Sequence, residues 1–570
     1  MEEYEEDFTL KDVDIKSKKF FDKLDKKKLA YISIISLIVI AIIIIIIIVA
    51  LSSSEDKNEE EEKNKISPKG EIICEYDVKS TEINTIILGQ NFTKPTDFEI
   101  EINGEIINYN KEHKFNSIGK NIVIFKLYND DINMNYMFKE ISSLISVNMT
   151  SEKDVKINSM ISSFDNCENL NNFNIEGYNI SYLKSMHKLF YKTSIKDINL
   201  TKIITENVED ISYMFGETEI SEIDFSNINL SSVINMSHIF DSCSSLREIN
   251  LSPSNTNNLK DISYMFHSCL SLKELNLEKF ETSNVIDMSH LFGNCIFLTS
   301  LNLKDFKTEN VMDMSYMFDN CESLSKLDLS SFDTSNTKNM SHMFQYCNYI
   351  SQLNLNNFNT EKVKDMSYLF YSMRRVTSLQ INEWDTKEVK NMTKMFQYCY
   401  LLNNLDISNF RTSNVLDMSS MFGGCSALSQ IDLKNFDTSS VLDMSGMFED
   451  CIKLKEIDLE NFRTPQVGNM SRMFEGCSSM VSININNFNT DKVQDMSYMF
   501  ESCGALSSIS LNSFRTNNVI SFSKMFRNCK SLLSLDVSNF STSKANDISN
   551  MFEGLEKIKI LNINNLTHTM

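Results

Sequence analysis

Glycine and proline are scarce in this chain of 570 residues, which has 14 glycines and 4 prolines. Such low numbers exclude a collagen-like chain and argue against a disordered low-complexity one. Positive charge is also in deficit, because 55 lysines and arginines face 77 aspartates and glutamates, for a formal net charge of -22. Nucleic acids and anionic membrane surfaces would repel this charge, so we predict no nucleic acid partner.

The residue pairings of catalytic and metal centres are lacking as well. None of the 13 cysteines lies in the closely spaced cysteine pair that most zinc sites use. His238, His290 and His342 share one outward slot, two repeats apart, and none pairs with a cysteine as a general base. The sequence therefore predicts no catalytic residue, no metal site, no cofactor and no small-molecule substrate.

One long apolar run stands near the N-terminus, from Leu29 to Leu51, and it contains no charged residue. It is long enough to cross a bilayer, which takes about 20 residues. A cleaved signal peptide is the competing interpretation, but its apolar region would be only about 7–15 residues long. We predict an uncleaved signal-anchor helix over residues 29–51.

Lysines are concentrated before this run, with seven between Lys16 and Lys28 and only three between Lys57 and Lys65. The positive-inside rule then predicts a type II topology, with a cytoplasmic tail over residues 1–28. The rest of the chain would face the cell exterior or an organelle lumen, and we expect the plasma membrane or cell surface. Residues 52–67 are acidic and polar, and they predict a stalk without a core.

Residues 68–129 contain short alternating runs separated by turn signals, including the Asn103-Gly104 hairpin cue. They predict a small β-sandwich-like domain that caps the segment after it. From residue 130 to residue 566 the sequence repeats, with 17 anchoring phenylalanines from Phe138 to Phe552 spaced by 26 residues, except for two steps of 25. A period of this length predicts a solenoid of the leucine-rich-repeat type.

The unit over residues 306–332 shows how one coil should fold. Met314, Phe318 and Cys321 recur with helical spacing, and Asp313 stands where a side-chain oxygen would cap a helix. Leu327 and Leu329 then alternate with polar residues, as in a strand. We therefore predict an α/β solenoid of about 17 coils, with a continuous parallel sheet on one side and short helical turns on the other.

Twelve cysteines follow the anchoring phenylalanines by three residues and form one column. A disulfide needs Cβ atoms about 3.5–4.5 Å apart with suitable directions, whereas in-register side chains on stacked coils all point the same way. We therefore favour a buried, inert thiol column over disulfides, and both over catalysis. The column consists of Cys167, Cys243, Cys269, Cys295, Cys321, Cys347, Cys399, Cys425, Cys451, Cys477, Cys503 and Cys529.

The repeated unit "MF-x-x-C-x-x-L-x-x-L-[DN]-L" resembles that of the BspA-like leucine-rich-repeat surface proteins, in a branch where methionine precedes the phenylalanine. The resemblance covers roughly residues 130–566. It implies a surface-displayed protein without enzymatic activity. Some members of that family bind extracellular matrix proteins or other cells, but the resemblance transfers no ligand-binding residue to this chain.

The least regular coil spans residues 370–396, where Met373 replaces the column cysteine. Tyrosine and arginine are typical of binding hot spots, so this coil and its neighbours form our candidate partner-binding site. Neutral drift in a redundant array is the alternative. The candidates are Tyr346, Tyr349, Tyr371, Arg374, Arg375, Tyr398 and Tyr400. The next candidate surface is the outward aspartate column from Asp406 to Asp458, which we interpret as a solvated ladder and not as a calcium site.

Twelve sequons for N-glycosylation would be usable if the repeats face the exterior or a lumen. They are Asn91, Asn148, Asn179, Asn199, Asn229, Asn235, Asn250, Asn339, Asn391, Asn469, Asn539 and Asn565. Two functions remain open on the sequence. One is a membrane-anchored protein that mediates adhesion or recognition of an extracellular protein or glycan. The other is a passive surface-coat or stalk protein.

Overall fold

The computed structural model describes residues 67–204, 206–251, 255–564 and 566, and residues 68–570 form one compact unit. The predicted tail, membrane anchor and stalk lie outside the described residues, apart from Ser67. Within the described ranges, no helix has the length and apolar character that crossing a membrane requires.

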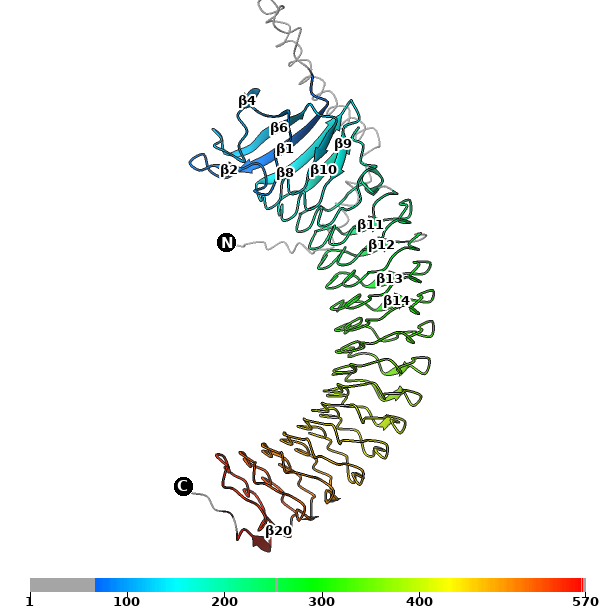
Figure 1. Cartoon of the computed structure of the whole chain (residues 1–570), viewed down its shortest axis with the longest axis vertical. Coiled ribbons are helices and arrows are strands. Elements are labelled where there is room, and N and C mark those ends of the chain that lie inside the picture. Colours follow the sequence, from blue (N-terminus) through cyan, green and yellow to red (C-terminus); the bar gives the residue numbers. More distant parts are fainter. Residues whose placement is uncertain (1–66, 205, 252–254, 565, 567–570) are drawn as a thin grey trace, which may run out of the picture. The chain divides into compact units, whose positions relative to one another are not determined.

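The N-terminal part of this unit shares its sheet with the first coils of the solenoid (Figure 1). The six-stranded sheet has the order β10-β8-β1-β6-β3-β4, and β2 pairs with β5 in a separate two-stranded sheet. Strand β1 pairs with β8 in antiparallel orientation, and β8 pairs on its other side with β10 in parallel orientation. The strands are β1 (Gly70–Val78), β2 (Thr85–Ile86), β3 (Phe98–Ile102), β4 (Glu105–Ile107), β5 (Glu112–His113), β6 (Gly119–Leu127), β8 (Leu144–Ser151) and β10 (Asn172–Glu176).

This arrangement differs from the predicted β-sandwich. Residues 68–129 contribute mainly to one mixed sheet that the first coils extend. The physical reason lies in the edge of β8, which would otherwise expose unpaired backbone groups at the end of the array. Pairing with β1 satisfies those groups and covers the first coil. The residues before the array therefore act as its N-terminal cap.

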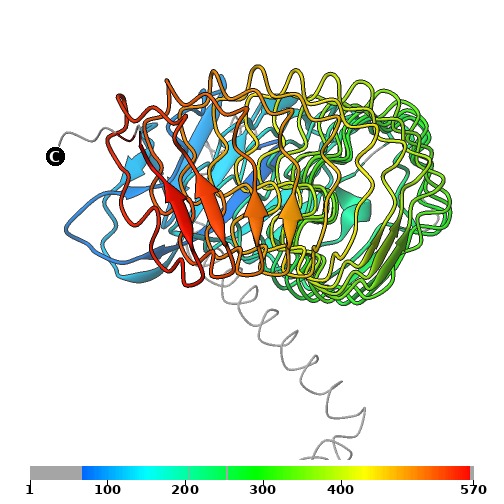
Figure 2. The same ribbon diagram turned by 90° about the horizontal axis from the view of Figure 1, so that it is seen from below.

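After the cap, the chain forms a β-solenoid of about 16 coils, and neighbouring coils lie side by side in chain order (Figure 1). Their strands are only two to four residues long and pair in parallel, as Figure 2 shows for the last coils. They are β7 (Asp131–Asn133), β9 (Lys156–Ser159), β11 (Glu222–Asp224), β12 (Glu248–Asn250), β13 (Glu274–Asn276), β14 (Ser300–Asn302), β15 (Gln352–Asn354), β16 (Ser378–Gln380), β17 (Asn404–Leu405), β18 (Ser482–Ile483), β19 (Ser508–Ile509), β20 (Ser534–Asp536) and β21 (Ile560–Asn562).

These strands form separate sheets of two or three, so the predicted continuous parallel sheet is wrong. The continuous ladder lies elsewhere, at the aspartate and asparagine column that we expected to cap helices. Asp313 forms parallel bridges with both Asp287 and Asn339, and its Oδ1 accepts a hydrogen bond from the Ser315 backbone N–H at 2.8 Å. The column thus supplies the predicted side-chain acceptor, but it closes a turn and joins coils.

The predicted helical turns are also wrong. In the described residues the only helical segment is the short 3₁₀ helix η2 (Leu200–Lys202). Each coil instead makes successive tight turns. Met317 N–H donates to the Met314 carbonyl at 3.3 Å, and Cys321 N–H donates to the Phe318 carbonyl at 3.2 Å. We call this part of the coils the turn side.

Left-handed backbone positions recur in these turns, at Tyr316 (φ 56°) and Asn320 (φ 56°) in the coil above. Two such turns direct an apolar side chain into the core every three or four residues. An amphipathic helix has the same spacing, so a short stretch of sequence fits either structure. Hydrogen bonds to the next coil complete the turns. Tyr316 N–H donates to the Ser341 carbonyl at 3.0 Å, and Phe318 N–H donates to that of Met343 at 2.9 Å.

Candidate recognition surface

The seven candidate residues between Tyr346 and Tyr400 come from three successive coils, and we call this surface the tyrosine–arginine patch. Four of its tyrosines are linked by ring contacts. The ring of Tyr371 lies 5.3 Å from that of Tyr346 and 5.5 Å from that of Tyr398, and Tyr398 lies 5.8 Å from Tyr400. The patch spans three coils because each tyrosine comes from a turn of a different repeat or from the residues just after it. Sequence spacing predicted this proximity, but not the edge-to-face contacts.

The two arginines of the patch are exposed and are held by neighbours. The Arg375 guanidinium lies 4.1 Å from the centroid of the Tyr349 ring, a cation–π contact, and Arg374 Nε donates to Ser372 Oγ at 3.3 Å. Within the described part of the chain neither arginine forms a salt bridge to a carboxylate. Their remaining N–H groups are available to a partner.

The aromatic part of the patch is partly open to solvent. Tyr349, Tyr398 and Tyr400 are 49%, 36% and 40% exposed. Tyr371 is half-buried, and burial together with its contact to Tyr346 raises the pKa of its hydroxyl, so it stays protonated at neutral pH. Met373, which made the coil irregular in sequence, is fully buried and fills the place of the missing cysteine.

Polar side chains around the patch are less completely satisfied than elsewhere. Among the described residues, three buried side-chain polar atoms have no hydrogen-bond partner, and two of them are Asn348 Oδ1 and Gln397 Oε1. Both residues flank patch tyrosines in sequence. Native proteins contain few buried polar atoms without a hydrogen bond. Where such atoms do occur, they are expected most often at functional sites.

A second aromatic feature, which the sequence analysis missed, leads into the patch. The three histidines assigned to an outward slot are stacked between tyrosines, with ring centroids 4.0–4.4 Å apart and interplanar angles of 8–11°. We call it the histidine–tyrosine stack. Its members are Tyr213, His238, Tyr264, His290, Tyr316, His342 and Tyr368.

Lysines close both ends of this stack, since Lys188 Nζ lies 4.9 Å from the Tyr213 ring centroid and Lys394 Nζ lies 5.1 Å from that of Tyr368. The last ring contacts the patch, where Tyr368 lies 5.3 Å from Tyr371. The signal in the sequence was the alternation of tyrosine and histidine at one repeat position.

Burial changes the ionisation of groups on this side of the coils. It lowers the pKa of His290 to about 4, with smaller effects from His267 and other neighbours, and it also lowers the pKa of His342. The stacked His290 is therefore neutral at physiological pH. Burial raises the pKa of Asp319 to about 6, although Gln345 Nε2 donates to its carboxylate at 3.1 Å.

The predicted cysteine column lies in the core. All twelve members are buried with free thiols, and so is Cys74 in β1. Cys321 Sγ donates to the Phe292 carbonyl of the preceding coil at 3.2 Å, and the same contact recurs along the array. Burial raises the pKa of Cys295 to about 12, which keeps its thiol protonated and unreactive.

The sequons differ in exposure. Asn91, Asn199 and Asn229 are exposed, whereas Asn339, Asn391 and Asn469 are half-buried at the turn column. At these column positions the side-chain oxygen accepts the backbone N–H two residues on. A glycan on the same side chain would crowd the neighbouring coils. Asn565 lies outside the described residues.

Comparison with solved structures returns matches of low sequence identity. The crystal structure of a TLR13–ssRNA13 complex matches with 14% identity over 77% of this chain and 74% of the other, at a TM-score of 0.22. A leucine-rich repeat protein from Eubacterium ventriosum ATCC 27560 matches with 14% identity over 72% of this chain and 90% of the other, at a TM-score of 0.23.

No curated protein matches the sequence significantly. A family model does match, five times in succession, over residues 132–249, 209–302, 298–379, 372–480 and 452–565. These matches cover nearly the whole solenoid and name no catalytic activity. The chain belongs to the family described as "Mycoplasma protein of unknown function, DUF285".

Proposed function

We propose that this chain is a recognition protein without enzymatic activity, in which the solenoid presents the tyrosine–arginine patch to an extracellular protein or glycan. In this proposal the apolar segment from Leu29 to Leu51 anchors the chain in the plasma membrane with the repeats outside. The proposal also includes the finer relationship to the BspA-like surface proteins, which rests on the repeated Met-Phe-x-x-Cys unit.

One observation carries the proposal, namely that three exposed tyrosines and two exposed arginines come from successive coils. Among the described residues, neither arginine forms a salt bridge to a carboxylate. Tyrosine and arginine dominate hot spots because they combine a large apolar area with directional hydrogen bonding. Here the ring contacts between neighbouring coils also hold the tyrosines in place before binding, which lowers the entropy lost on association. Because the chain as a whole is negatively charged, the exposed Arg374 and Arg375 favour a specific contact at this place.

Replacing both arginines tests this assignment. In Arg374→Ser with Arg375→Ser, the free energy of unfolding should change by less than about 1 kcal/mol, because both side chains are exposed. Adhesion of cells that display the full chain to the surfaces they recognise should weaken by about 2 kcal/mol or more, roughly thirtyfold. The surfaces to screen are extracellular matrix proteins and monolayers of other cells.

Arg463→Ser with Arg515→Ser provides the matched control, because it removes two other exposed arginines from the same array. This control should adhere like the wild type, and protease added outside intact cells should cut all three proteins equally. Equal adhesion by the patch variant would remove the patch as the binding site. Absence of adhesion by the wild type to every surface would favour the passive coat or stalk.

A further inference from the structure

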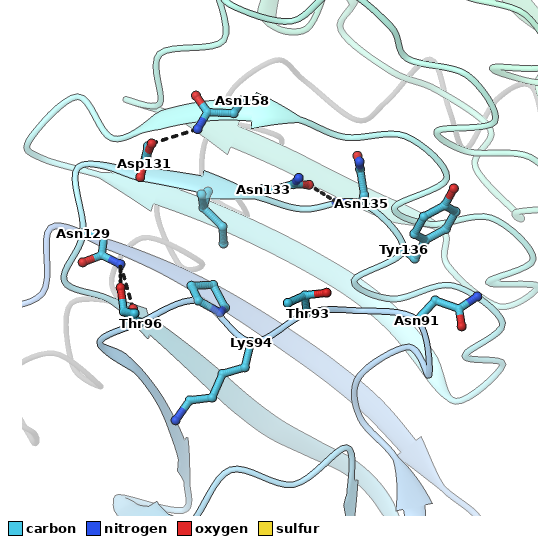
Figure 3. A pocket seen from close by; sticks show the side chains of 12 residues that line it. Asn91, Thr93, Lys94, Thr96, Asn129, Asp131, Asn133, Asn135, Tyr136 and Asn158 are labelled. Carbon is cyan, nitrogen blue, oxygen red and sulfur yellow. Dashed lines mark hydrogen bonds between the residues drawn. The ribbon is translucent and has the colours of Figure 1, made fainter.

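A polar groove lies where the segment after β2 faces the first coil, remote in sequence from the patch (Figure 3). Its cavity measures about 540 Å³, within the usual range of small-ligand sites. One wall comes from residues 91–96, and the other comes from residues 129–136 and Asn158. Asn129 joins the walls, since its Nδ2 donates to the Thr96 carbonyl at 2.7 Å and to Thr96 Oγ1 at 2.9 Å.

The charged side chains of the lining are occupied by other contacts. Lys94 Nζ lies 5.2 Å from the centroid of the Tyr109 ring, and its side chain points away from the groove in Figure 3. Asp131 Oδ2 accepts a hydrogen bond from Asn158 Nδ2 at 2.8 Å. Amides and hydroxyls therefore form most of the surface that faces the cavity.

Two of these amides have their oxygens engaged and their nitrogens free. Asn133 Oδ1 accepts the Asn135 backbone N–H at 2.9 Å, and Asn135 Oδ1 accepts from Ser159 Oγ at 2.6 Å and from the Ile161 backbone N–H at 2.8 Å. These bonds fix both amide orientations. Within the described ranges, neither Nδ2 group has a protein acceptor, so both can donate to a ligand.

Tyr136 supplies an aromatic surface to the same groove. It occupies the repeat position that Tyr213 and Tyr264 occupy in the histidine–tyrosine stack, and its backbone is left-handed like theirs. The next coil has Ser162 at that position, so the Tyr136 ring has no stacking partner among the described residues. Among the described residues, the Tyr136 ring is thus left without another ring stacked on it, and it lines the cavity.

We propose that this groove binds a neutral oligosaccharide of about two or three sugar residues, a size that suits the cavity. Sugar hydroxyls both donate and accept hydrogen bonds, which matches fixed amide donors beside hydroxyl and amide acceptors. The apolar face of a pyranose ring fits against an aromatic side chain with a polar tip, such as tyrosine. A sulfated or phosphorylated ligand fits less well, because the lysine of the lining is turned toward Tyr109.

The test uses the full-length chain from a host that does not attach N-glycans, so that Asn91 in the lining stays unmodified. The chain is held in a detergent without a sugar headgroup. The probes are neutral disaccharides and trisaccharides of glucose, galactose, mannose and N-acetylglucosamine, beside their sulfated and sialylated forms. Binding is measured by saturation-transfer nuclear magnetic resonance and by calorimetry.

We expect at least one neutral probe to bind, and Tyr136→Ser and Asn133→Ser each to weaken its binding by about tenfold or more. Serine occupies these two repeat positions at Ser162 and Ser159, so both variants should fold, and equal thermal unfolding checks this. Lys94→Ala should bind neutral probes like the wild type. Arg374→Ser with Arg375→Ser should do so as well, which separates this groove from the patch.

Three results would overturn the proposal. The first is that no neutral probe binds at millimolar concentration. The second is that Tyr136→Ser and Asn133→Ser bind as tightly as the wild type. The third is that only sulfated or sialylated probes bind and Lys94→Ala abolishes that binding, which would assign the groove to anionic ligands.

Discussion

At the scale of single residues, the turn side of the solenoid holds ionisable groups whose pKa values burial shifts in opposite directions. His290 lies between the rings of Tyr264 and Tyr316, and burial lowers its pKa to about 4. Asp319 lies on the same side, and burial raises its pKa to about 6. The two groups should therefore respond to acid with opposite effects on stability.

His290→Gln should reduce the loss of stability in acid. The unfolded chain binds a proton at this histidine near pH 6.5, whereas the folded chain does so only near pH 4. The histidine therefore lowers the free energy of unfolding as the pH falls through this window. Urea denaturation at about pH 7.5 and about pH 4.5 measures this effect. The free energy of unfolding of the variant, relative to that of the wild type, should be higher at the lower pH. An unchanged difference between the two proteins would contradict this prediction.

Asp319→Asn should show the opposite trend. Its folded pKa of about 6 lies above the usual unfolded value near 4, so the ionised carboxylate opposes folding at neutral pH. The variant should thus be favoured relative to the wild type at about pH 7.5, and this advantage should disappear at about pH 4.5. The same denaturation series measures both variants. If the stability of both variants relative to the wild type changed in the same direction between the two pH values, burial would not be the cause of the two pKa shifts.

At the scale of the element, the two left-handed residues in each coil set the path of the turn side. They include few glycines, and most coils place tyrosine, histidine, lysine, serine or asparagine at positive φ. Left-handed backbone costs an ordinary residue about 1–2 kcal/mol. Hydrogen bonds to the next coil and ring stacking offset this cost, so the turns depend on the assembled array.

Ser502 (φ 58°) tests this cost. Ser502→Gly should leave the free energy of unfolding within about 1 kcal/mol of the wild type or raise it, because glycine accepts this backbone freely and stands at the same repeat position in Gly476 (φ 71°). Ser502→Val should lower it by about 1–3 kcal/mol, because a β-branched residue fits this region poorly. Chemical denaturation compares the variants.

Ser508→Val is the matched control, since Ser508 lies in strand β19 of the same coil and is exposed. Valine favours strands, so this change should be nearly neutral. Equal destabilisation by valine at both positions would indicate a general effect of the added side chain and not one of backbone conformation.

At the scale of the whole molecule, the buried columns make the core continuous from coil to coil. The ring centroids of Phe318 and Phe344 lie 5.6 Å apart in a stacked arrangement. The Cys347 thiol donates a hydrogen bond to the Phe318 carbonyl, so the cysteine column lies beside the phenylalanine column. The predicted location of the repeats outside the cell would favour disulfides. The structure instead has all 13 cysteines buried and free.

Thiol counting in the full-length chain checks this arrangement. A thiol reagent should react slowly with the native protein and should label about 13 thiols after denaturation without reductant. Labelling of only a few thiols after denaturation would mean that disulfides had formed. Labelling after denaturation with reductant gives the total for comparison.

The sequence by itself determined the repeat, its period and the columns that enter the core. Those properties depend on the spacing of apolar residues, as at Phe318, Cys321 and Leu324, which are fully buried as predicted from the pattern. The sequence also pointed to Tyr349 and Arg375 as neighbours, because residues 26 apart occupy adjacent coils.

Only the tertiary structure decided the backbone of the turn side and the contacts between coils. Tyr316 gives no local signal for positive φ, since its conformation is stabilised by hydrogen bonds and stacking with the neighbouring coils. The same reason explains why helices were predicted where turns occur. The groove at Tyr136 likewise depends on the segment after β2 facing the first coil, a long-range contact that local spacing does not encode.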